Sequence, residues 1–171
     1  GSNLKAGRRI LSLLLTVCML ICMLPTAVFA ASDEGYMKVA MLDSGRKYFT
    51  VDWVKSFIYE AKADGYTHVM LAVGNDGMRF LLDDMSLSYS VDGTERSFTS
   101  DAVTRAVEAG NLSYTTASTG ELSETEMDRI ISYATERGIG VIPLVNTPGH
   151  MDAILYAAES LTGNNNLDYR G

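Results

Sequence analysis

The chain has 171 residues, of which 47% are hydrophobic and 20% are charged, a composition typical of folded globular proteins. Its formal net charge of -7 repels the phosphate backbone of nucleic acids, which disfavours DNA and RNA as partners. Both cysteines, Cys18 and Cys22, lie within the first thirty residues, so a disulfide within the rest of the chain is excluded.

The first thirty residues have the layout of a secretory signal peptide. A basic segment, residues 3–9, precedes an uncharged run that ends with the small residues Val28 and Ala30 at a cleavage site. We therefore predict a signal peptide over residues 1–30, a short linker over residues 31–36, and a secreted or cell-surface location. The alternative is an uncleaved membrane anchor, because an apolar run of about twenty residues can span a bilayer. The chain would then contact the membrane only through this leader. Removing the leader leaves 11 basic and 21 acidic residues, a net charge of -10.

A strand–helix–strand pattern opens the mature chain. Residues 37–43 form an apolar run of strand length. Thr50 can cap the helix that follows, whose apolar residues recur at spacings of one, three and four and mark one buried face. Gly65 ends this helix. Residues 67–73 then form a second apolar strand.

Residues 80–122 interrupt this pattern, and we treat them as an inserted loop region. An alternating segment around Asp92-Gly93 predicts a β-hairpin. Residues 100–111 predict a short helix with Ser100 as its N-cap. An excursion of this length is typical of functional or disordered segments. It leaves from the carboxyl end of the second strand, where parallel α/β proteins place their sites.

A helix–strand–helix pattern follows the insertion. Ser123 and Glu126 have the spacing of a capping box at the start of a helix that ends at Gly138. Residues 139–145 form a third apolar strand, and residues 151–161 begin another helix.

The alternation of these elements indicates the fold class. Strands that are apolar throughout, separated by amphipathic helices, predict a parallel sheet that is buried on both faces. Three parallel strands are too few for a closed barrel, and an open sheet of this size leaves an apolar edge unpaired. We therefore expect residues 37–171 to be the front part of a larger α/β domain.

Polar side chains follow each predicted strand. Because parallel strands point their carboxyl ends the same way, these side chains should converge on one face, which is the main sequence-based reason to expect a site here. They are Asp43 and Arg46 after the first strand, Asn75, Asp76 and Arg79 after the second, and Asn146 and His150 after the third.

Each of the main candidates also has a purely structural interpretation. Arg46 could be an ordinary surface arginine, Asp76 could form an Asx-type turn, and His150 could cap the helix that follows it. Asp83-Asp84 is interpreted as a solvated pair and His68 as a structural strand residue. The sequence has no glycine-rich phosphate loop, no metal-spaced His/Cys cluster and no nucleophile elbow, so we predict neither a metal nor a cofactor.

Three stretches, taken in order, resemble the catalytic domain of family 20 glycoside hydrolases, the β-N-acetylhexosaminidases. They are "LDSGRKYFTVDWVKSFI", "THVMLAVGNDGMRF" and "LSETEMDRIISYATERGIGVIPLVNTPGH". The resemblance covers roughly Lys38 to Leu161. It implies an α/β fold in which this chain forms the amino-terminal part, about three βα units, of a (β/α)₈ TIM barrel with its site at the carboxyl ends of the strands.

The resemblance also implies roles for individual residues. Arg46 matches the arginine that grips hydroxyls of the non-reducing sugar, a role that suits its planar fork of donors. His150 matches a histidine in a polar network that reaches the catalytic acid, and Asp76 is the candidate for the acid that joins this network. Many relatives read Asp-Asp-Gln-Gly-Trp at this point, so the division of roles between Asn75 and Asp76 stays open. Asn75 and Asn146 are candidates for substrate binding.

The mechanism implied by the resemblance is substrate-assisted retention, in which the 2-acetamido oxygen of the sugar attacks the anomeric carbon. It requires a general acid and a carboxylate that orients the acetamido group. In the family these are an adjacent Asp-Glu pair after the fourth strand. Asp is followed by Glu only at Asp33-Glu34, just past the leader. We therefore expect the catalytic pair to lie beyond Gly171 or to have been lost, and the fragment alone to be inactive.

These observations predict an exported glycoside hydrolase that removes terminal N-acetylglucosamine or N-acetylgalactosamine from glycans. A lacto-N-biosidase of the same family is a close variant. The alternative from a different class is a non-catalytic barrel that binds amino-sugar glycans, and an unrelated exported α/β protein is a third interpretation.

Overall fold

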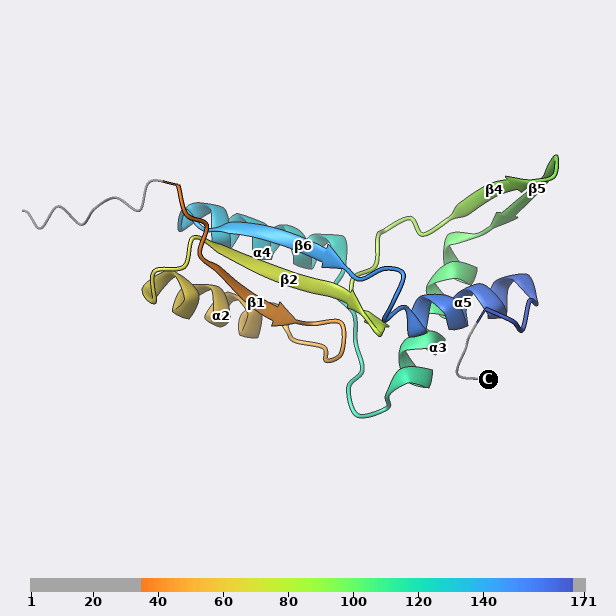
Figure 1. The fold of residues 1–171 in the computed structure, drawn as a ribbon, viewed down its shortest axis with the longest axis horizontal. Coiled ribbons are helices and arrows are strands. Elements are labelled where there is room, and N and C mark those ends of the chain that lie inside the picture. The colour runs from red at the N-terminus through yellow and green to blue at the C-terminus, as the bar shows by residue number, and fades with distance from the viewer. Residues whose placement is uncertain (1–34, 168–171) are drawn as a thin grey trace, which may run out of the picture. The chain divides into compact units, whose positions relative to one another are not determined.

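The computed structural model describes residues 35–167, and all its helices and strands belong to one compact unit that begins at Met37. At its centre is a parallel sheet in which β2 (His68–Asn75) lies between β1 (Val39–Asp43) and β6 (Gly140–Val145) (Figure 1). All three strands therefore end at the same edge of the sheet, as the sequence predicts.

The predicted signal peptide, residues 1–30, and residues 31–34 of the linker lie outside the described residues. No helix within residues 35–167 is long and apolar enough to cross a membrane.

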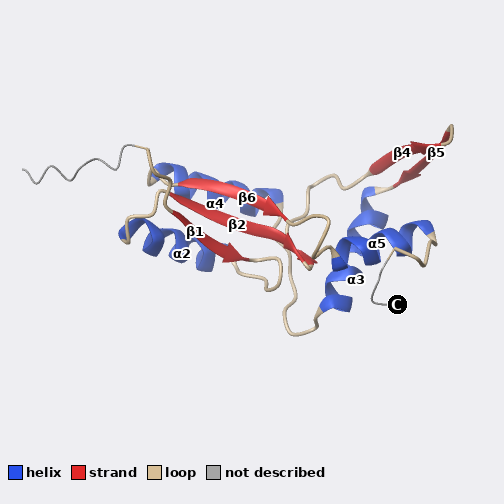
Figure 2. Cartoon of the chain, in the orientation of Figure 1, coloured by secondary structure: helices blue, strands red, loops and turns tan. Residues whose placement is uncertain are grey.

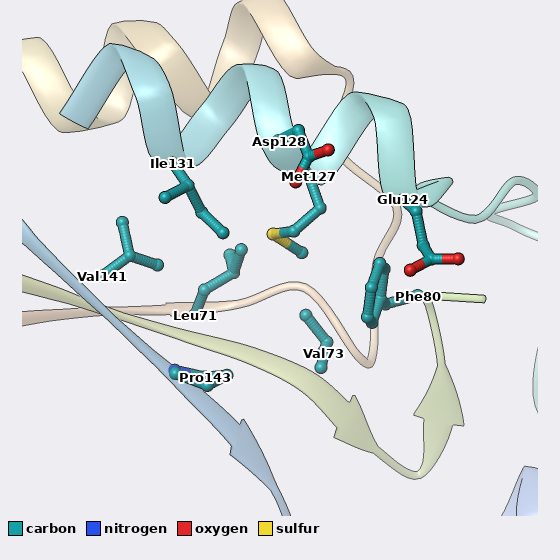
Figure 3. A pocket seen from close by; sticks show the side chains of 9 residues that line it. All are labelled: Leu71, Val73, Phe80, Glu124, Met127, Asp128, Ile131, Val141 and Pro143. Atoms are coloured by element: carbon teal, nitrogen blue, oxygen red, sulfur yellow. The ribbon is translucent and has the colours of Figure 1, made fainter. Parts of the chain in front are cut away.

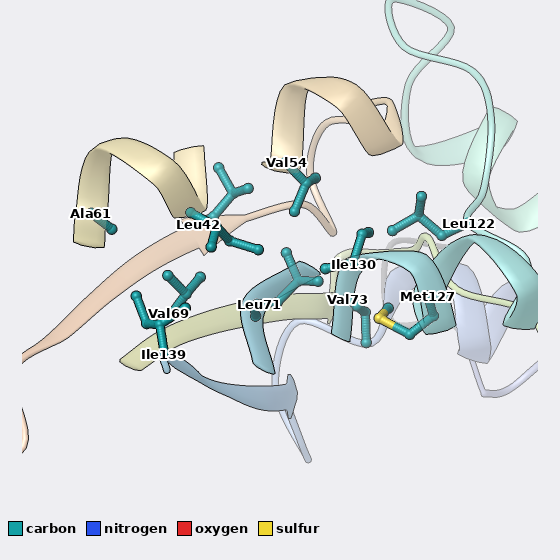
Figure 4. Packing of buried hydrophobic residues seen from close by; sticks show 12 residues of the cluster. Leu42, Val54, Ala61, Val69, Leu71, Val73, Leu122, Met127, Ile130 and Ile139 are labelled. Carbon is teal, nitrogen blue, oxygen red and sulfur yellow. The ribbon is translucent and has the colours of Figure 1, made fainter. Parts of the chain in front are cut away.

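Two amphipathic helices, α2 (Val51–Ala63) and α4 (Glu124–Glu136), pack on one face of the sheet. The predicted caps are confirmed: Thr50 accepts from the first turn of α2, and Ser123 forms a complete capping box with Glu126. The core between helices and sheet is a single cluster (Figure 4). Its buried residues are Leu42, Val54, Ile58, Ala61, Val69, Leu71, Val73, Leu122, Met127, Ile130, Ala134 and Ile139.

The prediction that both faces of the sheet are buried is wrong at β1. Leu42 points toward the helices and is 7% exposed, whereas its neighbour Met41 is 54% exposed. Successive strand residues point to opposite faces, and within the described part of the chain the helices cover only the face that Leu42 occupies.

The inserted region contains a hairpin and a helix (Figure 2). Strands β4 (Leu87–Val91) and β5 (Thr94–Phe98) pair in antiparallel fashion around the predicted Asp92-Gly93 turn. Both turn residues have positive φ, 51° and 77°, as a two-residue hairpin turn requires. The helix α3 (Ser100–Tyr114) follows. Its N-cap is Thr99 and not Ser100, because the Thr99 hydroxyl accepts from Ala102 while the Ser100 hydroxyl accepts from Met85.

Helix α5 (Asp152–Thr162) packs against α3 and begins two residues after His150. The two helices approach closely at Gly110, where a β-carbon would collide with the carbonyl oxygen of Ala153. A second, smaller core joins the helices through Val103, Ala106, Val107 and Ala157. The inserted region is therefore packed against the helix that follows the third strand.

Candidate functional site

Arg46 lies in the loop between β1 and α2, at the edge where the three strands end. Gly45 lets this loop lie against β2, because a β-carbon there would collide with the main chain of Asn75. The Nε atom of Arg46 donates to Oδ2 of Asp76 at 2.9 Å, and Nη1 lies 3.4 Å from Oδ2 of Asp43. The Arg46 side chain is nevertheless 45% exposed, so part of its guanidinium is open to a ligand.

Asp76 lies at the tip of a tight turn between β2 and the short strand β3 (Gly77–Met78), which folds back in antiparallel pairing. Its φ of 59° is in the left-handed region, which Asp tolerates better than most residues. Its Oδ1 lies 3.0 Å from Nδ1 of His150. The main chains are joined as well: Asp76 N–H donates to the His150 carbonyl at 2.7 Å, and the Asp76 carbonyl accepts from Ala153 at 2.8 Å. Asp76 therefore links the ends of β2 and β6.

His150 does not cap the helix that follows it. The N-cap of α5 is Met151, which makes no side-chain capping bond. His150 has a φ of 56°, and its ring turns to the carboxylate of Asp76. Asp76, in turn, directs its side chain to Arg46 and His150. The purely structural interpretations of Arg46, Asp76 and His150 therefore do not account for these contacts.

The protonation of this cluster follows from its contacts. Nδ1 of His150 lies 3.0 Å from Asp76 and 3.4 Å from Nη2 of Arg46. Because arginine can only donate and a carboxylate can only accept, Nδ1 can serve only one of the two. The shorter contact with Asp76 assigns the proton of the neutral ring to Nδ1, which leaves Nε2 as the acceptor nitrogen.

Asp76 is held in its ionised form. Burial alone raises the pKa of Asp76, but the hydrogen bonds and positive charges of Arg46 and His150 outweigh it, so the pKa lies below its ordinary value. The same hydrogen bond with Asp76 is the main cause that raises the pKa of Arg46. At neutral pH the cluster therefore pairs the cationic guanidinium of Arg46 with the anionic carboxylate of Asp76.

Asn75 and Asn146 lie beside this cluster and are joined to it through Asp43. Nδ2 of Asn75 donates to Oδ2 of Asp43 at 2.7 Å, and Nδ2 of Asn146 donates to Oδ1 of Asn75 at 3.2 Å. Asn75 is 6% exposed. The structure therefore separates the two residues that the sequence left unresolved: Asp76 contacts Arg46 and His150, whereas Asn75 bridges the neighbouring strands.

The structure brings the five residues with predicted roles into one network together with Asp43, which was predicted at the same edge but without a role. Asp43 ends β1 and accepts from both Arg46 and Asn75. The sequence indicates Asp43 only by its position, at the end of a strand and three residues before Arg46. A carboxylate there can hold the arginine in place, a use that a strand-end pattern alone does not reveal.

Arg79 does not join the others at the edge of the sheet, which corrects the sequence-based expectation. It is 1% exposed and donates to the main-chain carbonyls of Gly45, Ser118 and Gly120. His68 lies at the opposite, amino-terminal end of β2 beside Thr67, with 2.8 Å between Nδ1 and the hydroxyl oxygen. Asp83 and Asp84 are exposed, as predicted.

A separate apolar cavity of about 260 Å³ lies between α4 and the strands β2 and β6 (Figure 3). None of the polar network residues lines it. Its walls are Leu71, Val73, Phe80, Glu124, Met127, Asp128, Ile131, Val141 and Pro143. Among residues 35–167, no group of three or more His, Cys, Asp and Glu side chains could hold a metal ion.

Residues 38–170 match the model of a known family, described as "Glycosyl hydrolase family 20, catalytic domain". Among solved structures, the chain is similar to the pneumococcal virulence factor StrH, in a study of N-glycan recognition and hydrolysis. The identity is 41% and the TM-score 0.67, over 74% of this chain and 30% of that one. A mutant Streptomyces plicatus β-hexosaminidase in complex with its product GlcNAc is 26% identical with a TM-score of 0.54, over 70% and 21% of the two chains. The β-N-acetylhexosaminidase of Streptomyces coelicolor A3(2) is 25% identical with a TM-score of 0.53, over the same shares.

These matches confirm the predicted fold class. The described strands and helices are the amino-terminal part of a (β/α)₈ TIM barrel. The chain spans about 30% of the length of the pneumococcal structures that it matches.

Proposed function

The chain belongs to glycosyl hydrolase family 20, and we propose that it is part of an exported hydrolase that removes terminal N-acetylhexosamine from glycans. The observation that carries this proposal is the contact of Arg46, Asp76 and His150 at the carboxyl ends of three adjacent parallel strands. In TIM barrels this end of the sheet carries the active site.

Arg46 is the sugar-binding residue of this proposal. Its Nε is engaged by Asp76, which fixes the plane of the guanidinium. Its side chain is 45% exposed, and the Nη atoms can donate to two neighbouring hydroxyl oxygens of a sugar ring. Because Asp76 and Asp43 already balance the charge of Arg46, the ligand does not have to be an anion, and a neutral sugar with vicinal hydroxyls fits this arrangement.

His150 and Asp76 support the catalytic acid. Asp76 holds the proton of the neutral imidazole on Nδ1, which leaves Nε2 as the ring nitrogen that can contact a further acidic group. The His150 side chain is 54% exposed and therefore accessible to a further acidic group. In the proposed substrate-assisted mechanism, that group is the general acid of an Asp-Glu pair contributed by the rest of the enzyme.

The test uses the complete enzyme and chromogenic N-acetylglucosaminide and N-acetylgalactosaminide substrates. Replacing Arg46→Ala removes the donors to the sugar, and we expect kcat/KM to fall about ten- to a hundredfold, mainly through KM. Arg96→Ala is the matched control, because Arg96 is an exposed arginine of the β4–β5 hairpin, and it should leave both constants unchanged.

Two outcomes would contradict the proposal. An Arg46→Ala enzyme with wild-type KM would remove the sugar-binding role of Arg46. A complete wild-type protein that binds N-acetylglucosamine but hydrolyses neither substrate would favour the non-catalytic glycan-binding alternative. Hydrolysis only of substrates that carry a second sugar would favour the lacto-N-biosidase variant.

A further inference from the structure

A buried ion pair lies beneath the sugar-binding loop. Arg79 is 1% exposed, and its Nη1 lies 3.6 Å from Oε1 of Glu121, which comes from the inserted region. Burial lowers the pKa of Arg79, while the negative charge of Glu121 acts in the opposite direction. Burying a charge is costly unless it is paired and hydrogen-bonded. The site therefore has to supply enough partners for this guanidinium.

The partners of Arg79 are main-chain carbonyls of two different loops. Nε donates to Gly45 at 3.3 Å, Nη1 to Gly120 at 3.2 Å and Nη2 to Ser118 at 3.0 Å. Gly45 is the residue directly before Arg46. Arg79 thus joins the loop that carries Arg46 to the end of the inserted region.

Asn111 of α3 completes this arrangement. Its Oδ1 accepts from Met78 N–H and its Nδ2 donates to the Met78 carbonyl, both at 2.7 Å, so it holds the main chain two residues after Asp76. The same Nδ2 lies 2.8 Å from Oε1 of Glu121. Asn111 is itself 1% exposed. Arg79, Glu121 and Asn111 therefore form one buried polar cluster, the support cluster.

The support cluster is in direct contact with both loops of the site. A β-carbon on Gly77 would collide with the carbonyl oxygen of Gly45 and would lie 3.3 Å from both Arg79 Nε and Asn111 Oδ1. The main chain beside Arg46 and the main chain beside Asp76 thus touch each other over this cluster. Arg79 contacts Gly45, the residue before Arg46, and lies against Gly77, the residue after Asp76. A displacement of Arg79 would therefore be transmitted to Arg46 through Gly45 and to Asp76 through Gly77.

We propose that Arg79 is a positioning residue for the sugar site: by holding Gly45 it sets the place of Arg46 relative to Asp76, and Glu121 and Asn111 hold Arg79. This inference rests on the proposed function for its effect on substrate. It also gives the inserted region a task, since two of the three support residues belong to it. An error of about 1 Å in such a group can cost up to a hundredfold in rate.

Arg79→Lys in the complete enzyme tests the inference. Lysine keeps the charge but replaces the three-carbonyl fork with a single ammonium, so Arg46 should shift. We expect KM to rise about tenfold with a smaller change in kcat, at equal concentrations of folded enzyme. Glu121→Gln is a milder second variant, because it keeps the acceptor oxygen for Asn111 and removes only the charge, and its KM should rise about two- to fivefold.

A second readout does not depend on activity. Arg46 lowers the pKa of Asp76, so a displaced Arg46 should let the pKa of Asp76 rise toward its ordinary value. An NMR titration with labelled aspartate carboxyl groups measures this. Arg105→Lys is the matched control for both readouts, because Arg105 forms an exposed pair with Asp101 on α3, and neither KM nor the Asp76 titration should change.

The outcomes separate this inference from the proposed function. Folded Arg79→Lys and Glu121→Gln enzymes with wild-type KM and an unchanged Asp76 titration would overturn the positioning role, even if Arg46→Ala loses sugar binding. If the wild-type enzyme hydrolyses no amino sugar but Arg79→Lys shifts the Asp76 titration, the proposed function fails and the positioning role stands.

Discussion

Two arginines near the same edge of the sheet are used in opposite ways. Arg46 is 45% exposed and contacts two carboxylates. Arg79 is 1% exposed and donates its hydrogen bonds mainly to main-chain carbonyls. The side chain of Arg46 is exposed enough for a ligand to reach it, and its two Nη contacts within the protein are long, at 3.4 Å each. The donors of the buried guanidinium are engaged inside the protein, so Arg79 can hold the surrounding loops in place but cannot bind a ligand. Residue type alone therefore does not distinguish a binding arginine from a positioning one; exposure and the nature of the partners do.

The largest expected effect concerns stability. Arg79→Met leaves Glu121 and three carbonyls without their cation, and removing one partner of a buried ion pair costs about 3–5 kcal/mol. Arg46→Met removes a guanidinium that is 45% exposed, and Asp76 keeps its contact with His150, so the loss in the free energy of unfolding should be clearly smaller. Denaturant unfolding of the complete enzyme and both variants measures this difference. Equal destabilisation by the two substitutions would contradict the claim that Arg79 has a structural role that Arg46 lacks.

A smaller effect concerns acid. The pKa of Asp76 is lower in the folded protein than in the unfolded chain. Its contribution to stability is therefore present above the unfolded value of about 3.9 and is lost as the pH falls through the folded value. Asp76→Asn lacks this contribution, so its melting temperature should lie below that of the wild type at pH 7 and approach it below about pH 4.

Asp92→Asn is the control for this prediction. Asp92 also has a positive φ, which Asn tolerates equally well, but it lies in the exposed hairpin turn. We expect the difference in melting temperature between Asp92→Asn and the wild type to be nearly the same at pH 3 and at pH 7. Any change across this range should be small beside the change seen for Asp76→Asn. A pH-independent gap for Asp76→Asn would show that its carboxylate is not stabilised by Arg46 and His150.

Much of the fold could be predicted from the sequence because its local signals agree with one another. Thr50, Ser123 and Glu126 mark helix starts, and Asp92-Gly93 marks the hairpin; each acts through contacts within a few residues. The convergence of Arg46, Asp76 and His150 was also predictable, because it follows from the common direction of parallel strands.

The parts that the sequence did not reveal depend on long-range contacts. Arg79 follows the second strand like its neighbours, and only the packing of residues 118–121 against the first loop shows that it is buried. Asn75 and Asp76 contact different partners, and Asp76 has a left-handed φ of 59°, a backbone conformation that the residue types alone do not specify. Thr99 and not Ser100 is the N-cap of α3, and the Ser100 hydroxyl instead accepts a hydrogen bond from the main-chain N–H of Met85.

The most direct test of the site is the equilibrium binding of N-acetylglucosamine to the complete protein, measured by calorimetry for the wild type, Arg46→Ala and Arg96→Ala. Binding does not require turnover, so it tests the sugar site itself. We predict that Arg46→Ala weakens binding at least tenfold and that Arg96→Ala binds like the wild type. Equal affinity of all three proteins would contradict the assignment of the sugar site to Arg46.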